Sequence, residues 1–465
     1  MKLLRPRPVT QVTAVTYRCR VLRTLLPATA LALVATALAP APTTYAADGG
    51  SAATASTASS TAADETSARA GTADRSATRK INHQGWDGSA QWKKGRLDSV
   101  RIKRGRVFHQ PASATARREL GGTTYTTARW NGPWHRPGFS FTELIASWEA
   151  KTPGDSWIEV EVKGRAADGR RSSWDLMGRW AAGDKFVERT TVSGQSDDLA
   201  SVNVDTWKAP AGLVAYRLRV TLGRRAGAGS NPPSVGAVSA MASRLPSGSV
   251  QASAPGVVSK AGGTVLDVPT YSQMIHQGHY PQWGNGGEAW CSPTSTSMVL
   301  GYYDALPRAK DHSWVPAGHP DPWVDYAARM TYDHGYDGTG NWPFNTAYAA
   351  RQTGSGFVTR LRSMRETEVL VAAGIPVVIS IAFDRGQLSG APISASNGHL
   401  LVVVGFTAKG DVVVNDPAGA SNGAVRRTYD RGQLENAWLP RSGGTAYVIT
   451  DADHPLPSPE KHSNW

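Results

Sequence analysis

The chain has 465 residues, of which 40% are hydrophobic, and it carries 50 lysines and arginines against 37 aspartates and glutamates. This length predicts two or three domains with real cores, so a wholly disordered chain and a collagen-like repeat are excluded. The two cysteines, Cys19 and Cys291, are too few for a disulfide scaffold or a thiolate zinc cluster, so packing must supply the stability.

The first segment, residues 1–46, has the features of an export signal peptide. Basic residues precede an apolar stretch at Leu25–Leu38, and small residues follow at Ala46 and Ala47. Because the apolar stretch is shorter than the roughly 20 residues of a membrane span, cleavage is favoured over a membrane anchor. We therefore expect a secreted protein, extracellular or cell-wall associated, with no stable membrane insertion and with Cys291 as its one remaining cysteine.

Composition divides the rest of the chain into two globular parts and two spacers. Residues 47–80 and 245–263 are rich in small and polar residues, so we expect a disordered linker and an interdomain linker there. Residues 81–244 alternate apolar and polar side chains in short runs, as in Ile158–Lys163, bounded by Gly, Pro and Asp. This alternation predicts an all-β sandwich or jelly-roll module. Residues 264–455 form the second globular part.

The β module contains most of the basic excess and many tryptophans. Its aromatic rings and positive charge are suited to binding carbohydrate or an anionic cell-wall polymer. Tryptophans that fill a sandwich core, with arginines that keep the protein soluble, are the simpler interpretation, and we favour it. A removable pro-region that covers the catalytic cleft is a third alternative. The chain has no nucleic-acid reader motif, so nucleic acid is not an expected partner. The tryptophans of this part are Trp86, Trp92, Trp130, Trp134, Trp148, Trp157, Trp174, Trp180 and Trp207.

Cys291 lies where a helix is expected to begin. Ser292 and Pro293 follow it, and they are suited to a first helical turn that continues with apolar residues at helical spacing. The partial positive charge at a helix N-terminus favours the thiolate, which is the form that attacks carbonyl groups. An inert buried cysteine is the alternative, and the Gly-rich loop ahead of Cys291 counts against it.

A strand and its return strand place a histidine near an aspartate. Among the histidines in the body of the second part, only His399 opens a strong predicted strand, GHLLVVVGF, which returns as DVVVNDP. We expect Phe406 to face Asp411 across the turn. That register places Asp416 opposite Leu401 and on the same face as His399, within side-chain reach. Such an aspartate fixes the imidazole tautomer and leaves the other nitrogen for the thiol, although an aspartate that only starts a turn is the alternative.

Two weaker signals lie between these motifs. His276 and His279 in HQGH are potential metal ligands, but no carboxylate follows at a recognisable spacing, so we predict neither a metal site nor a cofactor. Asp333 and Asp337 in DHGYDGTG resemble half of a calcium loop, and a solvated loop is the better interpretation.

Four motifs in this order resemble a known family. Gln273 in VPTYSQ, Cys291 in WCSPTSTSMVLGYY, His399 in SNGHLLVVVGF and Asp416 in VVVNDP are similar to the peptidase C39-like family. These are papain-fold cysteine peptidases related to the bacteriocin-processing double-glycine peptidases. The resemblance covers about residues 264–450, and it implies an α+β protein in which a papain-like cysteine peptidase domain follows the β module.

The resemblance also implies a role for each motif. Cys291 is the implied nucleophile, and His399 the general base and then acid. Asp416 is the implied orienting residue, and Gln273 donates to the oxyanion beside the backbone N–H of Cys291. One departure is Ser292, where the family usually has Gly, so the approach of the backbone to substrate is left open.

We expect a peptide or protein substrate whose peptide bonds are hydrolysed by a Cys-His-Asp triad. Acyl transfer to an amine and hydrolysis of peptidoglycan peptides use the same chemistry until the acceptor arrives, so they remain alternatives. A non-catalytic cell-wall or glycan-binding protein is the alternative of another class.

Overall fold

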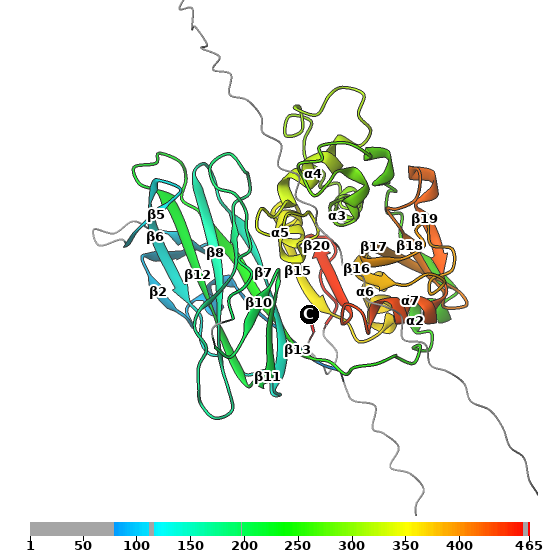
Figure 1. Ribbon diagram of the computed structural model, residues 1–465, viewed down its shortest axis with the longest axis horizontal. Coiled ribbons are helices and arrows are strands. Elements are labelled where there is room, and N and C mark those ends of the chain that lie inside the picture. The colour runs from blue at the N-terminus through cyan, green and yellow to red at the C-terminus, as the bar shows by residue number, and fades with distance from the viewer. Residues whose placement is uncertain (1–78, 111–115, 197, 459–463) are drawn as a thin grey trace, which may run out of the picture. The chain divides into compact units, whose positions relative to one another are not determined.

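The computed structural model describes residues 79–110, 116–196, 198–458 and 464–465. The predicted signal peptide, and residues 47–78 of the first predicted linker, lie outside them. The described residues belong to one compact unit of mixed helices and sheets, with few helices and many strands (Figure 1). None of the described helices is both long enough and apolar enough to cross a membrane.

Two antiparallel sheets form the N-terminal module, as the alternating sequence pattern predicts (Figure 1). The first sheet has the order β10 (Ser201–Asn203), β11 (Thr206–Leu213), β7 (Phe141–Lys151), β13 (Ser234–Arg244), β4 (Arg106–His109) and β3 (Val100–Lys103), and β1 (Lys80–Asp87) also pairs with β13. The second has the order β2 (Arg96–Asp98), β6 (Thr123–Asn131), β12 (Ala215–Arg225), β8 (Ser156–Arg165) and β9 (Asp175–Trp180), and β5 (Ala116–Leu120) pairs with β6. The short helix α1 (Gly88–Trp92) follows β1.

The pairing of β8 with β12 shows how the alternating pattern builds this module. Val160 lies opposite Val220, and both are fully buried. On the other face, Glu161 lies opposite Arg219 and forms an ion pair with it. Apolar side chains therefore gather between the two sheets and charged ones pair on the outer face, since successive residues of a strand point to opposite sides.

The tryptophans of the module mostly fill its core. Seven of the nine are at most 2% exposed, so ring stacking on a carbohydrate is not available to them. Trp134 and Trp174 are half-buried, and guanidinium groups lie over both rings, with Arg165 at 4.4 Å from the first and Arg219 at 4.3 Å from the second. The core-filling interpretation is thus confirmed for the seven. The buried seven are Trp86, Trp92, Trp130, Trp148, Trp157, Trp180 and Trp207.

A third antiparallel sheet forms the centre of the C-terminal part. Its order is β15 (Ser355–Arg360), β20 (Thr445–Thr450), β16 (Val377–Phe383), β17 (Ser396–Thr407), β18 (Val412–Asn415) and β19 (Arg426–Tyr429), and β14 (Gly263–Val265) also pairs with β17. The helices are α2 (Val257–Lys260), α3 (Cys291–Tyr302), α4 (Pro322–Thr331), α5 (Trp342–Thr353), α6 (Met364–Ala372) and α7 (Arg431–Trp438). Three short 3₁₀ helices are η1 (Met274–His276), η2 (Gly287–Ala289) and η3 (Asn422–Ala424).

Both faces of this sheet are buried, which explains the unbroken apolar run of β17. Leu400 and Val402 belong to the hydrophobic cluster that includes residues of α3 and α5. Leu401 and Val403 belong to a separate cluster with residues of α6 and α7. Because both faces of this strand are covered, apolar side chains are favoured on both, and its sequence is a continuous run of Leu and Val.

The expected register of the β17–β18 hairpin is wrong at the turn and right near the histidine. Phe406 pairs with Val412 rather than with Asp411, and a bulge between Val403 and Gly405 then shifts the register by one residue. Beyond the bulge, Val402 pairs with Asn415. This is the pairing that the predicted register requires at that end, because a bulge inserts one unpaired residue into one strand.

The N-terminal and C-terminal parts share one hydrophobic cluster. Phe344 of α5 packs between Trp148 and Trp180, with ring centroids 6.0 and 5.3 Å away. Polar contacts accompany this packing, since the Ser147 hydroxyl accepts a 2.9 Å hydrogen bond from the backbone N–H of Val358. The two parts therefore meet through an aromatic core with a polar contact beside it.

Asp333 is not in a solvated loop, contrary to our interpretation of DHGYDGTG. It is fully buried, and its carboxylate accepts hydrogen bonds from the Thr191 backbone N–H at 2.9 Å and the Thr191 hydroxyl at 2.7 Å. It also accepts from the Asn341 side-chain amide at 2.9 Å. The residue ties the C-terminal part to the segment after β9.

Candidate active site

Cys291 begins α3, as its flanking residues predict. The loop before it contains three successive residues with positive φ, Gly284, Asn285 and Gly286, which turn the chain sharply into η2. The helix is then buried from Ser292 to Leu300, so it is held on all sides. Cys291 itself is half-buried, and the thiol is therefore at the start of a rigid helix and open to the cleft.

Side chains of α3 fix it against the third sheet. The Ser295 hydroxyl donates a 3.1 Å hydrogen bond to the backbone carbonyl of Leu400, the residue after His399. Ser292, which departs from the usual family pattern, is fully buried and its hydroxyl bonds to that of Tyr447 at 2.9 Å. The Ser292 side chain therefore points into the domain, and the helix that carries Cys291 is fastened beside the strand that carries His399.

His399 and Asp416 meet as predicted. The His399 Nε2 atom lies 2.7 Å from Asp416 Oδ1, and the two residues are 3% and 1% exposed. The Asp416 carboxylate also accepts hydrogen bonds from the Tyr429 hydroxyl at 2.6 Å and the Ala418 backbone N–H at 3.0 Å. The Cys291 side chain is near enough to His399 to help raise the pKa of the imidazole. Since Nε2 faces the carboxylate, Nδ1 is the nitrogen left for the sulfur.

The charges of this group favour a protonated imidazole. Burial alone would lower the pKa of His399, but the Asp416 carboxylate and the Cys291 side chain outweigh it and raise the pKa to about 10. Burial likewise opposes ionisation of Asp416, yet His399 and the Tyr429 hydroxyl bring the pKa of that carboxyl below its ordinary value. The pair is thus stable as an imidazolium beside a carboxylate.

Gln273 lies between the segments that carry Cys291 and Asp416. Its backbone N–H donates a 2.8 Å hydrogen bond to the carbonyl of Pro417, the residue after Asp416. Its side-chain amide donates to the backbone carbonyl of Glu288, in the loop ahead of Cys291. The structure therefore holds Gln273 between these segments, with one of its two amide N–H groups bonded to Glu288.

A cavity of about 580 Å³ opens beside the thiol. It is bounded by the loop before α3, the loop before α5 and the facing ends of β16 and β17. Further walls come from the turn between β10 and β11 in the N-terminal module and from Arg441 and Ser442 after α7. Residues of these groups include Gly284, Asn285, Ala289, Cys291, Tyr336, Trp342, Ile381, Asn397, Gly398, Asn203, Val204, Asp205 and Lys208.

The β10–β11 turn was not predicted to be part of the site. Val204 has a φ of 54°, a strained value for a β-branched residue. Beside it, the buried Asp205 carboxylate accepts a 3.0 Å hydrogen bond from the backbone N–H of Trp342, the first residue of α5. Burial raises the pKa of Asp205 to about 6. Sequence patterns carry no signal for this contact, because it joins residues more than a hundred positions apart.

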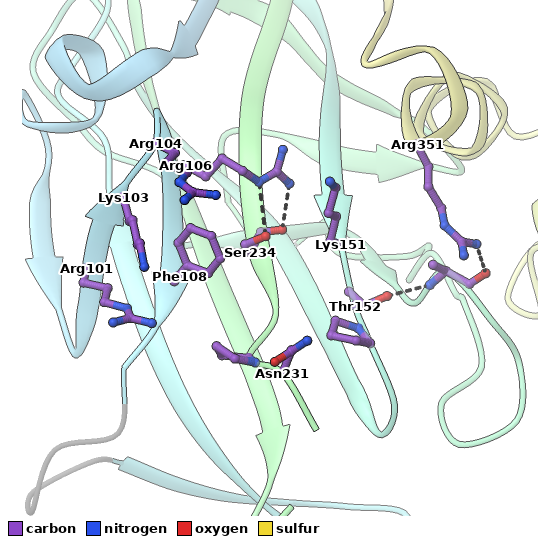
Figure 2. Close-up of a pocket in the computed structure, with 13 residues that line it drawn as sticks. Arg101, Lys103, Arg104, Arg106, Phe108, Lys151, Thr152, Asn231, Ser234 and Arg351 are labelled. Carbon is purple, nitrogen blue, oxygen red and sulfur yellow. Dashed lines mark hydrogen bonds between the residues drawn. The ribbon is translucent and has the colours of Figure 1, made fainter. Parts of the chain in front are cut away.

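A second cavity, of about 690 Å³, is basic. Figure 2 shows its residues, with Arg106 donating to Ser234 and Arg351 reaching in from α5. No acidic side chain lines it among the described residues, although Glu149 pairs with Arg106 from outside the lining. Part of the basic excess of the module therefore gathers around one hollow. The cationic lining residues are Arg101, Lys103, Arg104, Arg106, Lys151 and Arg351.

Comparison with family models gives two adjacent matches. Residues 82–243 match the Peptidase C39 N-terminal domain, and residues 265–446 match the Peptidase C39-like family. No curated protein is similar enough to count as a relative. Among solved structures, a C39-like peptidase from Bacillus anthracis is 16% identical, with the match covering 40% of this chain and 98% of that chain. Its TM-score is 0.27, so the likeness carries no argument about the fold. On the two family matches, which confirm the resemblance of the four motifs, the chain belongs to the C39-like peptidases.

Proposed function

We propose that the protein is a cysteine peptidase of papain-like fold that hydrolyses peptide bonds through Cys291, His399 and Asp416. The observation that carries this proposal is the buried 2.7 Å contact between His399 and Asp416, with Cys291 near enough to the same imidazole to help raise its pKa. A base held by an orienting group beside a nucleophile is what acyl transfer through a thioester requires.

The mechanism assigns each atom a task. The Cys291 sulfur attacks the carbonyl carbon, and the carbonyl π electrons move to the oxygen. Because the first N–H groups of a helix have no intrahelical partner, the backbone N–H of Cys291 is free to donate to that oxyanion. The His399 imidazolium then protonates the leaving amine as the thioester forms. His399 next removes a proton from water, which attacks the thioester and releases the acid and the thiolate.

One N–H of the Gln273 amide is bonded to the Glu288 carbonyl, and the second N–H can donate to the oxyanion. Replacing an oxyanion donor lowers kcat by about 100-fold or more. We expect Gln273→Ala to show that loss in kcat with little change in KM. An unchanged kcat would instead limit Gln273 to holding the loop before Cys291 through its bond to Glu288.

A peptide-library cleavage profile tests the proposed activity. The full exported chain should cleave a defined subset of peptides, and Cys291→Ala and His399→Ala should not. His312→Ala, a histidine of the same part that lies outside the triad, should retain the parent profile. Alkylation of the parent with iodoacetamide should abolish cleavage, since Cys291 is the one thiol expected after signal removal. Cleavage of the same peptides by Cys291→Ala at the parent rate would contradict the assignment.

We also propose that the protein acts outside the cell, on the basis of the export signal in its sequence. The mass and N-terminal sequence of the protein recovered from culture medium test this. The expected product begins near Ala47 or Asp48 and retains the β module.

Binding of an anionic cell-wall polymer is a second proposed role, favoured by the basic cavity. Six lysine and arginine side chains line this cavity, and of these Arg106 is paired with Glu149. The other five place positive charge around one hollow, which attracts a negatively charged polymer. Co-sedimentation with purified cell walls at rising ionic strength measures this. Combined Lys103→Ala and Arg104→Ala substitution should weaken binding, whereas Lys260→Ala on α2 should not. Equal binding by all three proteins would refute the role.

A further inference from the structure

Two histidines and an aspartate meet at a place that the proposed reaction does not use. His276 Nδ1 lies 3.1 Å from Asp325 Oδ2, and His279 Nδ1 lies 2.9 Å from Asp325 Oδ1. One donor atom from each of the three residues lies within 4.8 Å of the other two. This carboxylate lies on α4, 46 residues after His279, so the spacing of the HQGH motif does not predict it.

The local backbone explains how the two imidazoles face one carboxylate. His276 ends η1, and Gly278 follows with a φ of 77°, in the left-handed region that favours glycine. The His279 backbone N–H then bonds to the His276 carbonyl at 2.9 Å. This tight turn brings both rings to the same side, against the first turns of α4 that carry Asp325.

The Asp325 carboxylate is buried, so it needs a partner that compensates for its lost hydration. Asp325 and His276 are completely buried. Within the described residues, the side-chain partners of Asp325 are these two imidazoles, and Arg329, one turn later, is committed to Asp184 at 2.7 Å. A buried carboxylate is costly unless it is paired or coordinates a metal.

A third histidine adds unpaired donor capacity beside the cluster. The ring of His319 stacks on that of His279, with centroids 3.9 Å apart. His319 Nδ1 is buried and has no hydrogen-bond partner among the described residues. A hydrogen-bonded network built only for structure is expected to satisfy such atoms.

We propose that His276, His279 and Asp325 bind a zinc ion. Imidazole nitrogen and carboxylate oxygen are both zinc ligands, at about 2.0–2.2 Å from the metal, which places neighbouring tetrahedral ligands about 3.3 Å apart. The nitrogen-to-oxygen separations of 2.9 and 3.1 Å are close to that spacing. Three protein ligands leave one position for water or His319.

The zinc ion braces the loop that shapes the active site. His276 lies three residues after Gln273, and its ring is 6.1 Å from that of Trp290, the residue before Cys291. A zinc ion bound by both His276 and Asp325 therefore links this loop to α4 and fixes the segment between Gln273 and Trp290. Zinc binding itself does not depend on the proposed peptidase activity, so the two proposals fail separately.

Metal content of the full exported chain, produced without a histidine tag, tests the site. A Cys291→Ala background prevents the catalytic thiol from binding zinc. After chelation and dialysis against zinc, we expect one equivalent by mass spectrometry of the metal. The His279→Gln and Asp325→Asn variants should lose it, and His312→Gln, a histidine outside the cluster, should retain it. Zinc uptake by the parent no greater than that of His279→Gln would overturn the site, as would equal loss in His312→Gln.

A second readout keeps the test independent of misfolding. His279 is partly exposed, so His279→Gln should fold, with the circular dichroism of the chelated parent. Zinc should raise the unfolding midpoint of the parent by about 4 °C or more and leave that of His279→Gln unchanged. A parent midpoint that does not respond to zinc would identify the cluster as a metal-free hydrogen-bond network and refute the proposal.

Discussion

Replacing Asp416 by asparagine is the sharpest test of the proposed catalytic group. The carboxylate is 1% exposed and accepts from His399, Tyr429 and Ala418, so an amide of nearly the same shape keeps the packing and removes the charge. Without that charge, burial dominates the titration of His399 and its pKa must fall. The imidazolium that protonates the leaving amine then exists over a narrower pH range.

The size of the effect follows from the pKa of His399. At about 10, the imidazole is about 99% protonated at pH 8. If the Asp416→Asn variant returned it only to the ordinary value of about 6.5, about 3% would be protonated at pH 8, a fall of about 30-fold. The expected loss of activity at pH 8 is therefore about 30-fold.

The assay is the pH dependence of kcat/KM on a peptide identified by library cleavage. The parent should lose activity only as the pH rises toward 10, and Asp416→Asn should lose it near pH 6.5 or below. Asp411→Asn, an aspartate at the turn of the same hairpin, serves as the control and should match the parent. An alkaline limb at the same pH in Asp416→Asn and the parent would refute the role of Asp416 in holding the proton on His399.

Three further substitutions test the structure around the site. Asp205→Asn should raise the free energy of unfolding at pH 7 by up to about 3 kcal/mol, measured by urea unfolding. The reason is that the pKa of Asp205 is raised to about 6 in the folded state, so its ionisation destabilises the folded protein as the pH rises from 3.8 to 6. A gain that persists below pH 3.8 would contradict this. Phe344→Ala should cost about 3–5 kcal/mol, measured in the same way, and a cost below 1 kcal/mol would show that the shared core is not tightly packed. Gly287→Ala should lower the peptidase rate, since its Cβ would lie 2.0 Å from the His276 carbonyl oxygen, whereas Gly183→Ala, with nothing within 4 Å, should not.

The pairing of His399 with Asp416 was predictable because both lie on one hairpin. A two-residue period and a short turn limit the possible registers. The predicted register is off by one residue at the turn, and the bulge between Val403 and Gly405 shifts the pairing by one residue, so that the prediction holds at the His399 end. The position of Cys291 was predictable for a similar reason, because helix starts have local signatures. These parts of the site depend on short stretches of chain.

The remaining parts depend on contacts between distant segments. Asp325 reaches His279 from another helix, and Asp205 reaches Trp342 from another module. Neither contact leaves a periodic or spacing pattern in one sequence. Asp333 was misread for the same reason, because a loop composition predicts exposure whereas its partner Thr191 lies far away in the chain. The burial of most tryptophans in the N-terminal module was easier to predict, since large aromatic rings are mostly buried on average.

The aromatic contact of Phe344 with Trp148 and Trp180 has a consequence for how the protein folds. One hydrophobic cluster contains residues of both parts, so each part supplies surface to the core of the other. Folding of the C-terminal part, and with it the placement of Cys291 at the start of α3, is therefore coupled to folding of the N-terminal module. A chain cut between the two parts would expose the ring of Phe344 and would be prone to aggregate before it ever met a substrate.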